Sequence, residues 1–237
     1  MQRLDLSLDE PGMNLALEEA LLLRAESCGG ESIRFWRFHR TVVVLGRGSK
    51  IRDEVDLAFC DQNAIPVLRR CSGGASIVAG PDCLMYSVVL DLVSRPQLRN
   101  VDLAHQFVIG NLAAAIQSQR PEAQWQGICD LTLEDKKFSG NSLRIARNHL
   151  LYHGTLLQAV DQPLIQACLK TAPRQPEYRN RREHDEFVTN ISINAAEFCD
   201  CLAERYGAEE VMVDWPIEET QLLHQSKYAD PEWHWRH

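Results

Sequence analysis

The sequence has no apolar run that approaches the ~20 residues needed to cross a bilayer. Its first residues, MQRLDLSLDEPG, contain no continuous apolar segment of the kind that secretory signals carry. None of the eight cysteines forms a CxxC pair, and the one CxC, Cys199 to Cys201, has no second Cys or His pair to complete a zinc site. We therefore expect a cytoplasmic protein with reduced thiols, no metal site and no membrane contact.

Cations are also scarce, because 25 Lys and Arg face 33 Asp and Glu, for a net charge of -8. Proteins that bind nucleic acid need a basic face to displace counterions, so we expect no nucleic-acid partner. The phosphate-binding patterns GxxxxGK[ST] and GxGxxG are both missing. Residues 136–147 are a local exception, with Lys136, Lys137, Arg144, Arg147 and no acid. This stretch indicates a site for something negatively charged.

The periodicity of apolar residues predicts an α+β fold. The 237 residues allow one large or two small domains, and without an internal repeat or a clear linker we expect one domain, 1–237. Residues 13–26 have the period of an amphipathic helix, with Glu18 and Glu19 mostly off its apolar face. Two strands, 33–38 and 41–45, are expected to flank a tight polar turn. Further strands are expected at 65–70, 84–90, 123–125, 131–133, 137–138 and 150–152, and further helices at 53–62, 101–118, 194–206 and 217–227.

Two less regular segments complete this description. Residues 173–185 are rich in Pro, Arg and Asn, which is typical of an exposed loop. The end of the chain, WHWRH, carries His234 and His237, and with His224 these side chains could suggest metal binding. A frayed tail is the simpler expectation. The predicted architecture is a set of mixed, largely antiparallel sheets packed with helices.

Two glycine-containing segments follow cations: RRCSGG at 69–74 and KKFSGN at 136–141. Adjacent glycines let a ligand approach backbone N–H groups, and a neighbouring arginine can hold a carboxylate or phosphate by two hydrogen bonds. A lysine supplies a point charge that can stabilise a developing oxyanion. Taken alone, each segment is better explained as a tight turn beside solvated cations, because glycine turns are common.

Together, the two segments resemble the lipoate-protein ligase A family, within the wider group of biotinyl/lipoyl protein ligases and octanoyltransferases. The resemblance runs through NLALEEALL, RFWRFHRTVVVLGR, PVLRRCSGGA, DLTLEDKKFSGNSLR, HLLYHGTLL and FVTNIS, in this order, over roughly residues 12–192. The GRGSK segment at 46–50 is similar to a loop of biotin ligases, but the later motifs favour the lipoyl branch. The resemblance implies a catalytic domain of the biotinyl/lipoyl ligase type.

The resemblance also assigns roles to residues. Lys137 corresponds to the family's essential lysine, which contacts the acyl carbonyl and the activated phosphate. Ligase activity would use ATP and Mg²⁺ with lipoate or octanoate, and would modify a lysine of a lipoyl carrier domain. The carrier would be of the 2-oxoacid dehydrogenase E2 or glycine cleavage H protein type. The acyl and nucleotide pocket would be lined by Arg70, Ser72, Gly73, Gly74, Ala75, Ser139, Gly140, Asn141, His153, Gly154 and Thr155.

Several positions depart from the family pattern. Ala75 replaces the third glycine of SGGG, and Ala79-Gly80 and Asp82-Cys83 replace the His-Asp and Gly-Asn pairs that usually follow. Cys129 stands where the family has the Asn of NDL. The chain also ends where full-length ligases continue into a C-terminal accessory domain. The resemblance therefore implies a catalytic domain alone, to which a separate accessory chain would be added.

Cys129 leaves the chemistry open. Octanoyltransferases of this group carry the acyl chain on a cysteine, either a few residues upstream of the position of Cys129 or in a later loop, where this chain has Ala172. Cys129 could therefore be a nucleophile, provided that a cation such as Lys137 lowers its pKa. A packing substitution for Asn is the favoured explanation. Three functions remain: a lipoate ligase, an octanoyltransferase that takes its donor from acyl carrier protein, and a binding module without catalysis.

Overall fold

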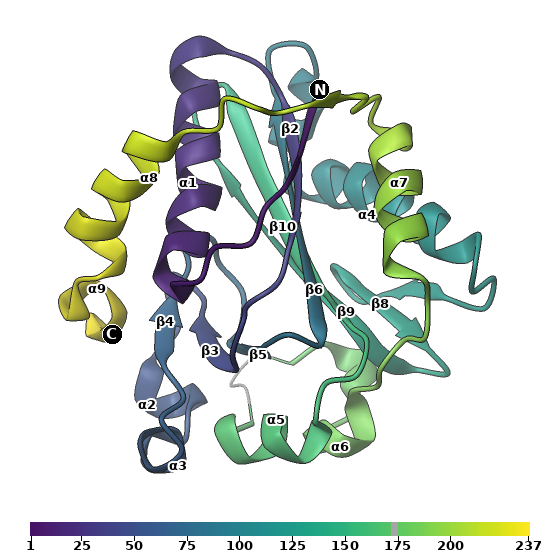
Figure 1. Cartoon of the computed structure of the whole chain (residues 1–237). Coiled ribbons are helices and arrows are strands. Elements are labelled where there is room, and N and C mark those ends of the chain that lie inside the picture. Colours follow the sequence, from purple (N-terminus) through teal and green to yellow (C-terminus); the bar gives the residue numbers. More distant parts are fainter. Residues whose placement is uncertain (172–174) are drawn as a thin grey trace.

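The structure is a computed structural model that describes residues 1–171 and 175–237. Its centre is an eight-stranded sheet with the order β11-β1-β2-β6-β10-β9-β8-β7 (Figure 1). Only the pairs β11–β1 and β1–β2 are parallel. The remaining neighbours in this sheet are antiparallel, as the sequence predicts. The strands are β1 (Gln2–Asp5), β2 (Ser32–Trp36), β6 (Cys83–Asp91), β7 (Gln124–Gln126), β8 (Asp130–Leu133), β9 (Lys136–Ile145), β10 (His149–Leu157) and β11 (Glu210–Val211).

A second sheet has three strands in the order β4-β3-β5. The predicted hairpin of 33–38 with 41–45 is therefore wrong, because β2 lies in the large sheet and β3 in the small one. Both strands are buried along their whole length, and β2 buries Ser32 and Arg34 beside its apolar residues, so the residue pattern does not show which neighbour each strand takes. β3 pairs in parallel with β4 and antiparallel with β5. The small sheet consists of β3 (Val42–Leu45), β4 (Val67–Arg69) and β5 (Ile77–Ala79).

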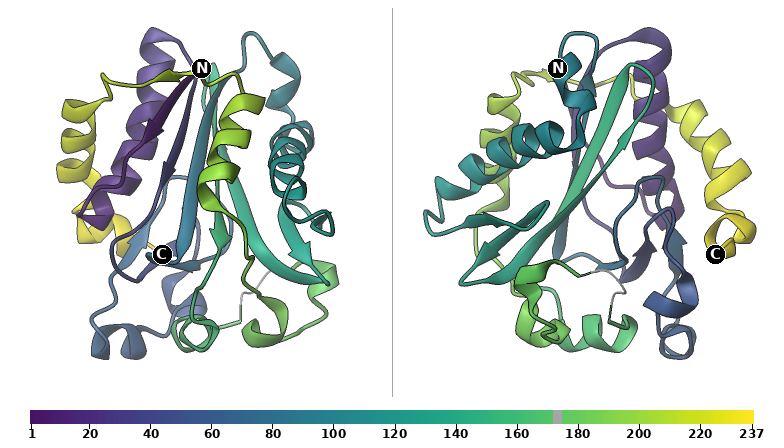
Figure 2. Two further views of the ribbon diagram at one scale, coloured as in Figure 1. Left: turned by 45° about the vertical axis from the view of Figure 1, so that its right-hand side comes forward. Right: turned by 180° about the vertical axis from the view of Figure 1, so that it is seen from behind.

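Helices cover both faces of the large sheet (Figure 2). Successive strand residues point to opposite faces, and the core divides accordingly. Val89 and Leu151 pack with α1, whereas Val88 and Leu150 pack with the side that carries α4 and α7. The helices are α1 (Pro11–Cys28), α2 (Ile51–Glu54), α3 (Leu57–Gln62), α4 (Val101–Gln117), α5 (Gln162–Cys168), α6 (His184–Phe187), α7 (Ala195–Arg205), α8 (Ile217–Leu223) and α9 (Pro231–Trp235), with short 3-10 or π turns η1 (Pro96–Arg99), η2 (Glu177–Arg179) and η3 (His224–Tyr228).

The helix α1 is buried on two sides, which the sequence did not indicate. Its apolar face packs on the sheet, and α8 and the following turn η3 cover the opposite side (Figure 1). Glu18 and Glu19 are consequently almost inaccessible, at 1% and 4% exposure. The expectation that they lie mostly off the buried face is wrong. Glu18 faces the sheet and bonds to His153 of β10. Glu19 is covered by the second layer, because Lys227 and Tyr228 of η3 bond to it.

The two segments predicted to be irregular are also ordered in part. Residues 173 and 174 of the expected exposed loop lie outside the described residues, as does Ala172. The rest of that loop includes η2 and the start of α6, and buries Arg179 and His184. The expected frayed tail forms α9 and buries His234. None of the helices within 1–171 and 175–237 combines the length and apolar character needed to cross a membrane.

Candidate active site

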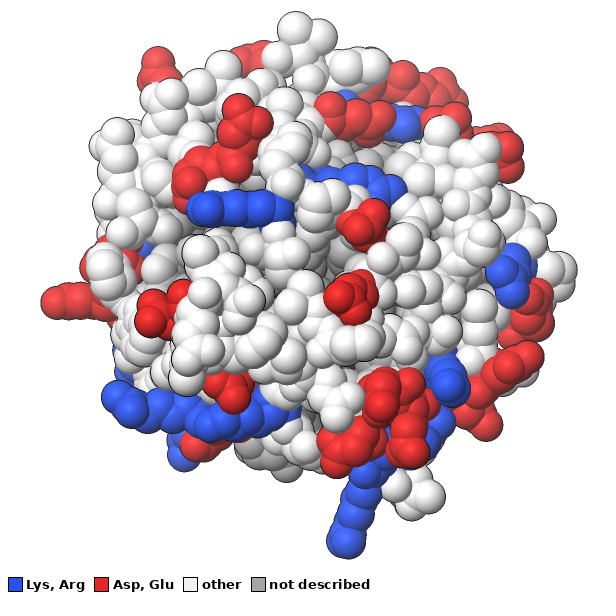
Figure 3. All heavy atoms as spheres, turned by 60° about the horizontal axis from the view of Figure 1, so that its bottom comes forward, with Lys and Arg blue, Asp and Glu red and all other residues white. Residues whose placement is uncertain are grey.

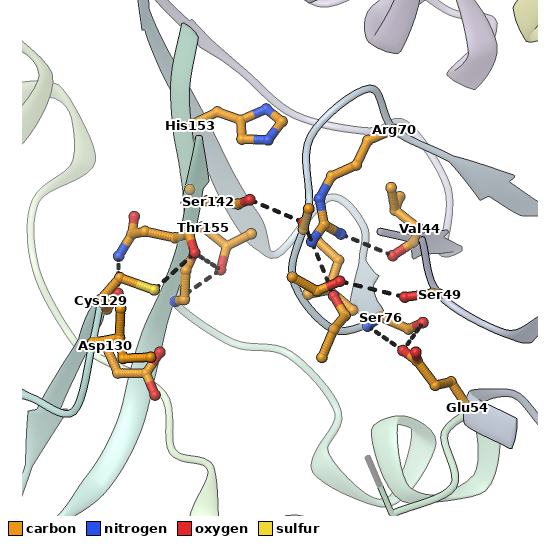
Figure 4. A pocket seen from close by; sticks show the side chains of 18 of the residues that line it. Val44, Ser49, Glu54, Arg70, Ser76, Cys129, Asp130, Ser142, His153 and Thr155 are labelled. Atoms are coloured by element: carbon orange, nitrogen blue, oxygen red, sulfur yellow. Dashed lines mark hydrogen bonds between the residues drawn. The ribbon is translucent and has the colours of Figure 1, made fainter. Parts of the chain in front are cut away.

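A cavity of about 740 Å³ lies between the small sheet and strands β8, β9 and β10. Figure 4 shows its two walls, with the loop after β4 that carries Arg70 on one side and Cys129 and Asp130 on the other. Its lining includes many of the residues named by the resemblance. These are Arg70, Gly73, Gly74, Ala75, Lys137, Gly140, Asn141, His153, Gly154 and Thr155, together with Cys129.

The glycines of SGN and HGT lie within strands rather than in turns. Asn141 pairs with Gly154 across β9 and β10, and the hydrogen bond from the Tyr86 hydroxyl to the Asn141 amide oxygen crosses directly above Gly154. A Cβ atom on Gly154 would lie 1.8 Å from that oxygen, closer than any real contact. The glycine in HGT thus makes room for Asn141 to reach Tyr86, which is a packing reason for its presence in a strand.

Lys137 lies at the start of β9 with its ammonium group directed at Asp130. The Lys137 Nζ to Asp130 Oδ1 distance is 2.7 Å, and the Tyr178 hydroxyl donates to the other carboxylate oxygen at 2.7 Å. The Lys137 side chain passes over Gly140, where an added Cβ would lie 2.8 Å from both Cε and Nζ. Lys137 keeps 29% side-chain exposure, so its charge is oriented by protein and open to the cavity.

The other cations of 136–147 do not form the predicted patch. Arg144 pairs with the buried carboxylate of Glu19 at 2.5 Å, on the side of the sheet that faces α1. Figure 3 shows acidic and basic side chains interspersed on the face that carries α5, α6 and the α2–α3 segment. Within the described residues, Lys137 is the lysine that lines the cavity beside the SGN motif.

Arg70 is buried and binds the loop in which it lies. Its Nε donates to the Ser72 hydroxyl at 3.1 Å, and its terminal nitrogens donate to backbone oxygens of Val44, Gly73 and Ala75. Burial lowers the Arg70 pKa to about 10. The sequence suggests that Arg70 holds a ligand anion with two hydrogen bonds. In the structure its guanidinium group donates mainly to main-chain carbonyls instead. Arg70 gives the loop its shape and places positive charge behind Gly73 and Gly74.

A chain of three hydrogen-bonded side chains runs behind this loop. The His153 Nδ1 lies 2.7 Å from Glu18 Oε2, and the His153 Nε2 lies 2.5 Å from the Ser72 hydroxyl. Burial alone would raise the Glu18 pKa, but the adjacent His153 and Arg34 hold it below its ordinary value. The Glu18 carboxylate therefore accepts from Nδ1–H, which leaves Nε2 to accept from Ser72.

The order Glu–His–Ser matches that of a hydrolase triad, but its exposure does not fit a nucleophile. Ser72 is 1% exposed and does not line the cavity, whereas His153 does. Ser72 also accepts from Arg70. The chain of bonds thus fixes the His153 ring and the loop that follows β4. Ser139, fully buried in β9, is likewise behind the wall rather than part of it.

Cys129 lines the cavity one residue before Asp130. Its thiol donates to the Asn141 carbonyl oxygen at 2.9 Å. Burial raises the Cys129 pKa, the adjacent Asp130 carboxylate raises it further, and the opposing effect of Lys137 is smaller. The lowered pKa that a nucleophilic thiolate needs is therefore not present in this arrangement.

Three residues of the site were not singled out from the sequence. Glu54 accepts from both the amide and the hydroxyl of Ser76, which fixes the end of the glycine loop. Tyr178 holds Lys137 through Asp130, and Glu18 bonds directly to His153. Glu54 and Tyr178 lie outside the motifs that carry the resemblance, so spacing could not reveal them. Glu18 lies in the motif NLALEEALL, but the motif does not show that this carboxylate faces His153.

Residues 10–206 match the family described as lipoyl protein ligase A/B catalytic domain. The chain belongs to this family. The fold and the arrangement of the SGG, KxSGN and HG segments around one cavity agree with that membership.

Relatives in the family carry two different names. Lipoate–protein ligase 1 of Staphylococcus aureus is 26% identical over 231 residues, which cover 96% of this chain and 66% of that protein. Octanoyltransferase LipM of Carboxydothermus hydrogenoformans is 24% identical over 254 residues, which cover 94% of each. The chain spans 43% to 66% of the length of three proteins named as lipoate-protein ligases.

Solved structures support the fold. A chain from a bi-partite lipoate protein ligase and its E2 lipoyl domain, from Thermoplasma acidophilum, has a TM-score of 0.82 at 21% identity. The alignment covers 99% of this chain and 95% of that chain. A lipoate-protein ligase A bound with ATP has a TM-score of 0.79 at 21% identity, over 99% and 98% of the two chains. At this identity the likeness shows the fold alone.

Proposed function

We propose that this protein attaches lipoate, or octanoate, to a lysine of a lipoyl carrier domain through an acyl-adenylate. The observation that carries the proposal is the position of Lys137, whose ammonium group lines the cavity between the SGN and SGG segments. Asp130 and Tyr178 hold that charge in place. A fixed cation beside a cavity of about 740 Å³ can stabilise a negatively charged acyl or phosphate oxygen.

The chemistry divides into two steps. The acid's carboxylate attacks the α-phosphorus of ATP, which forms the acyl-adenylate and releases pyrophosphate. The carrier's lysine amine then attacks the acyl carbon, and AMP leaves with the bonding electrons as an amide forms. Lys137 would face the oxygen that gains charge in both steps. Mg²⁺ would arrive on the ATP phosphates, as it does in most nucleotide sites.

The partner proposed is a lipoyl carrier domain of the E2 or H-protein type, and a separate accessory chain is proposed for the activation step. The support is the Thermoplasma relative, described as bi-partite and studied with an E2 lipoyl domain. In T. acidophilum a related protein is also named as subunit 1 of a lipoate-protein ligase, and 96% of this chain aligns with it.

The second candidate is an octanoyltransferase that uses Cys129. It is favoured by the alignment with LipM along 94% of both chains and by the position of the thiol on the cavity wall. It is opposed by the raised pKa of Cys129 and by the bond from its thiol to a carbonyl oxygen. We therefore prefer the ligase function to the octanoyltransferase function.

Mass spectrometry of a lipoyl carrier domain separates the two candidates. The purified protein is given one of three donors: lipoate with ATP, synthetic lipoyl-AMP, or the octanoyl thioester of acyl carrier protein without ATP. We expect a lipoyl amide on the carrier from lipoyl-AMP, whether or not an accessory chain is present, because this donor bypasses activation. Addition from lipoate and ATP, with or without an accessory chain, would show the complete ligase.

The variant Cys129→Ser decides the mechanism. We expect it to keep transfer from lipoyl-AMP within about threefold of the parent, because the thiol takes no part in an adenylate mechanism. An acyl thioester on Cys129, formed from the carrier-protein donor and lost in Cys129→Ser, would establish the transferase instead. No transfer from any of the three donors would leave the binding module as the remaining function.

A further inference from the structure

The end of the chain is bonded to the main chain of an edge strand. β4 is at the edge of the small sheet, so one side of its backbone has no strand partner. The Arg69 amide N–H donates to His234 Nδ1 at 2.9 Å, and the Trp233 indole N–H donates to the Arg69 carbonyl at 2.8 Å. Two side chains of α9 thus satisfy the groups that a neighbouring strand would otherwise satisfy.

The Arg69 side chain extends the same connection. Its guanidinium group is fully buried and donates to the carbonyl oxygens of Trp233 and His234 on one side. On the other side it donates to the carbonyls of Gly46 and Ser49, both at 2.8 Å. One arginine therefore joins the tail to the GRGSK segment, and it faces main-chain oxygens instead of a ligand.

The loop held in this way is part of the cavity. Gly48, Ser49 and Lys50 line it, and the Ser49 hydroxyl donates to the Gly74 carbonyl at 3.3 Å. A Cβ on Gly46 would lie 1.8 Å from that same carbonyl oxygen, so the two loops are in direct contact. The tail adds two further bonds, from Arg236 to the Arg47 carbonyl and from the Ile51 amide to the His237 carbonyl.

We propose that residues 231–237 form a strap that positions the cavity loop 46–50, with His234 and Arg69 as its positioning residues. The strap lies beyond residues 10–206, the part of the chain that matches the family. His234 does not line the cavity, so it acts through Arg69 and the loop. Its role as a positioning residue in catalysis rests on the proposed function, whereas its effect on the loop does not.

The two ring nitrogens of His234 allow a matched pair of variants. Nδ1 accepts from the Arg69 amide, and Nε2 lies 3.0 Å from the Tyr228 carbonyl, to which it donates. In His234→Asn the amide oxygen can take the place of Nδ1. In His234→Gln the amide nitrogen can take the place of Nε2, but nothing accepts from the Arg69 amide. Trp235→Ala, at an exposed position of the same helix, is the control.

Hydrogen exchange followed by mass spectrometry measures the loop directly. We expect His234→Gln to speed amide exchange in residues 46–54 about tenfold, because a buried hydrogen bond that anchors them is lost. Exchange in the buried helix α4 should stay unchanged, which shows that the variant is folded. His234→Asn and Trp235→Ala should exchange like the parent.

A transfer assay with lipoyl-AMP then links the strap to the site. We expect His234→Gln to raise the apparent KM several-fold with kcat within about twofold of the parent, and His234→Asn to restore the parent value. If exchange in 46–54 is the same in all four proteins, the strap is wrong whatever the enzyme does. If exchange rises but the protein never transfers an acyl group, the strap stands and the proposed function fails.

Discussion

Lys137 and Lys136 are neighbours whose environments differ completely. Lys137 is paired with Asp130 and lines the cavity, whereas Lys136 is exposed and points elsewhere. The pair has modest value for stability, because Lys137 is 29% exposed and exposed ion pairs contribute roughly 0–1 kcal/mol. Its value lies in orientation. The carboxylate directs the ammonium group before any ligand arrives.

We therefore expect Lys137→Ala to lower transfer from lipoyl-AMP by ~10²-fold or more while the free energy of unfolding changes by less than about 1 kcal/mol. Single-turnover kinetics and urea unfolding measure the two effects. Lys136→Ala is the matched control and should leave both unchanged. Transfer by Lys137→Ala within twofold of the parent would remove this lysine from the mechanism.

These environments explain which single residues could be predicted from the sequence. Lys137, Gly140 and Gly154 lie in contiguous motifs, and the chemistry of those motifs needs no long-range information. Glu18 and Tyr178 are placed by contacts with residues that are 135 and 48 positions away. Arg70 was assigned to a ligand because an arginine beside glycines suits an anion. The folded loop instead offers it carbonyl oxygens at closer range.

Among the elements, α1 holds the second layer of the molecule in place. The Glu19 carboxylate of α1 accepts from Arg144 on β9, and from Lys227 Nζ and the Tyr228 hydroxyl in η3. Burial alone would raise the Glu19 pKa, but the Lys227, Tyr228 and Arg144 donors hold it below its ordinary value. Glu19 thus connects the sheet to the C-terminal segment through one buried anion.

We expect Glu19→Gln to lower the free energy of unfolding by about 3 kcal/mol, because it leaves two cations facing a neutral amide in a buried site. Urea unfolding followed by circular dichroism measures it. Glu219→Gln, on the exposed side of α8, should change stability by no more than about 0.5 kcal/mol. Equal unfolding midpoints for the two variants would contradict a stabilising role for Glu19.

At this scale α1, α4, α7, α8 and most strands were predictable, but their partners were not. The single helix expected at 53–62 is two helices, α2 and α3, and α5, α6 and α9 were not predicted. Periodicity identifies one apolar face of α1, and it cannot show that α8 and η3 cover another. The strands expected at 33–38 and 41–45 do form, yet both are buried throughout, so the sequence does not show that they enter different sheets. The tail has no periodicity at all. Its order comes from bonds to Arg69, 165 residues earlier.

At the scale of the whole molecule, the shifted pKa values of three histidines and two glutamates make the folded state less stable as the pH falls below 7. Burial lowers the pKa values of His105, His184 and His234. The folded state therefore binds fewer protons than the unfolded state as the pH falls below about 6.5, the ordinary value for histidine. Stability from these groups is present above that pH and is lost as the pH falls toward their folded values. Glu18 and Glu19, with lowered pKa values, act in the same direction at lower pH.

We expect the free energy of unfolding to fall steadily between pH 7.5 and pH 5, by up to about 1.4 kcal/mol per pH unit for each of His105, His184 and His234. Urea unfolding at half-unit intervals measures this slope. A constant stability over this range would show that His105, His184 and His234 do not gain protons on unfolding.

In two places a C-terminal segment contacts an N-terminal one, and these contacts form late because the chain is synthesised from its N-terminus. β1 lies between β2 and β11, so one edge of β1 stays unpaired until residues 210 and 211 add to the large sheet. Glu19 likewise receives Lys227 and Tyr228 from the far end. A ribosome releases the N-terminal residues first. While the last segment is still in the exit tunnel, α1 lacks the layer that shields Glu19, and β1 has an open edge. The nascent chain would therefore expose these surfaces to chaperones until translation is nearly complete.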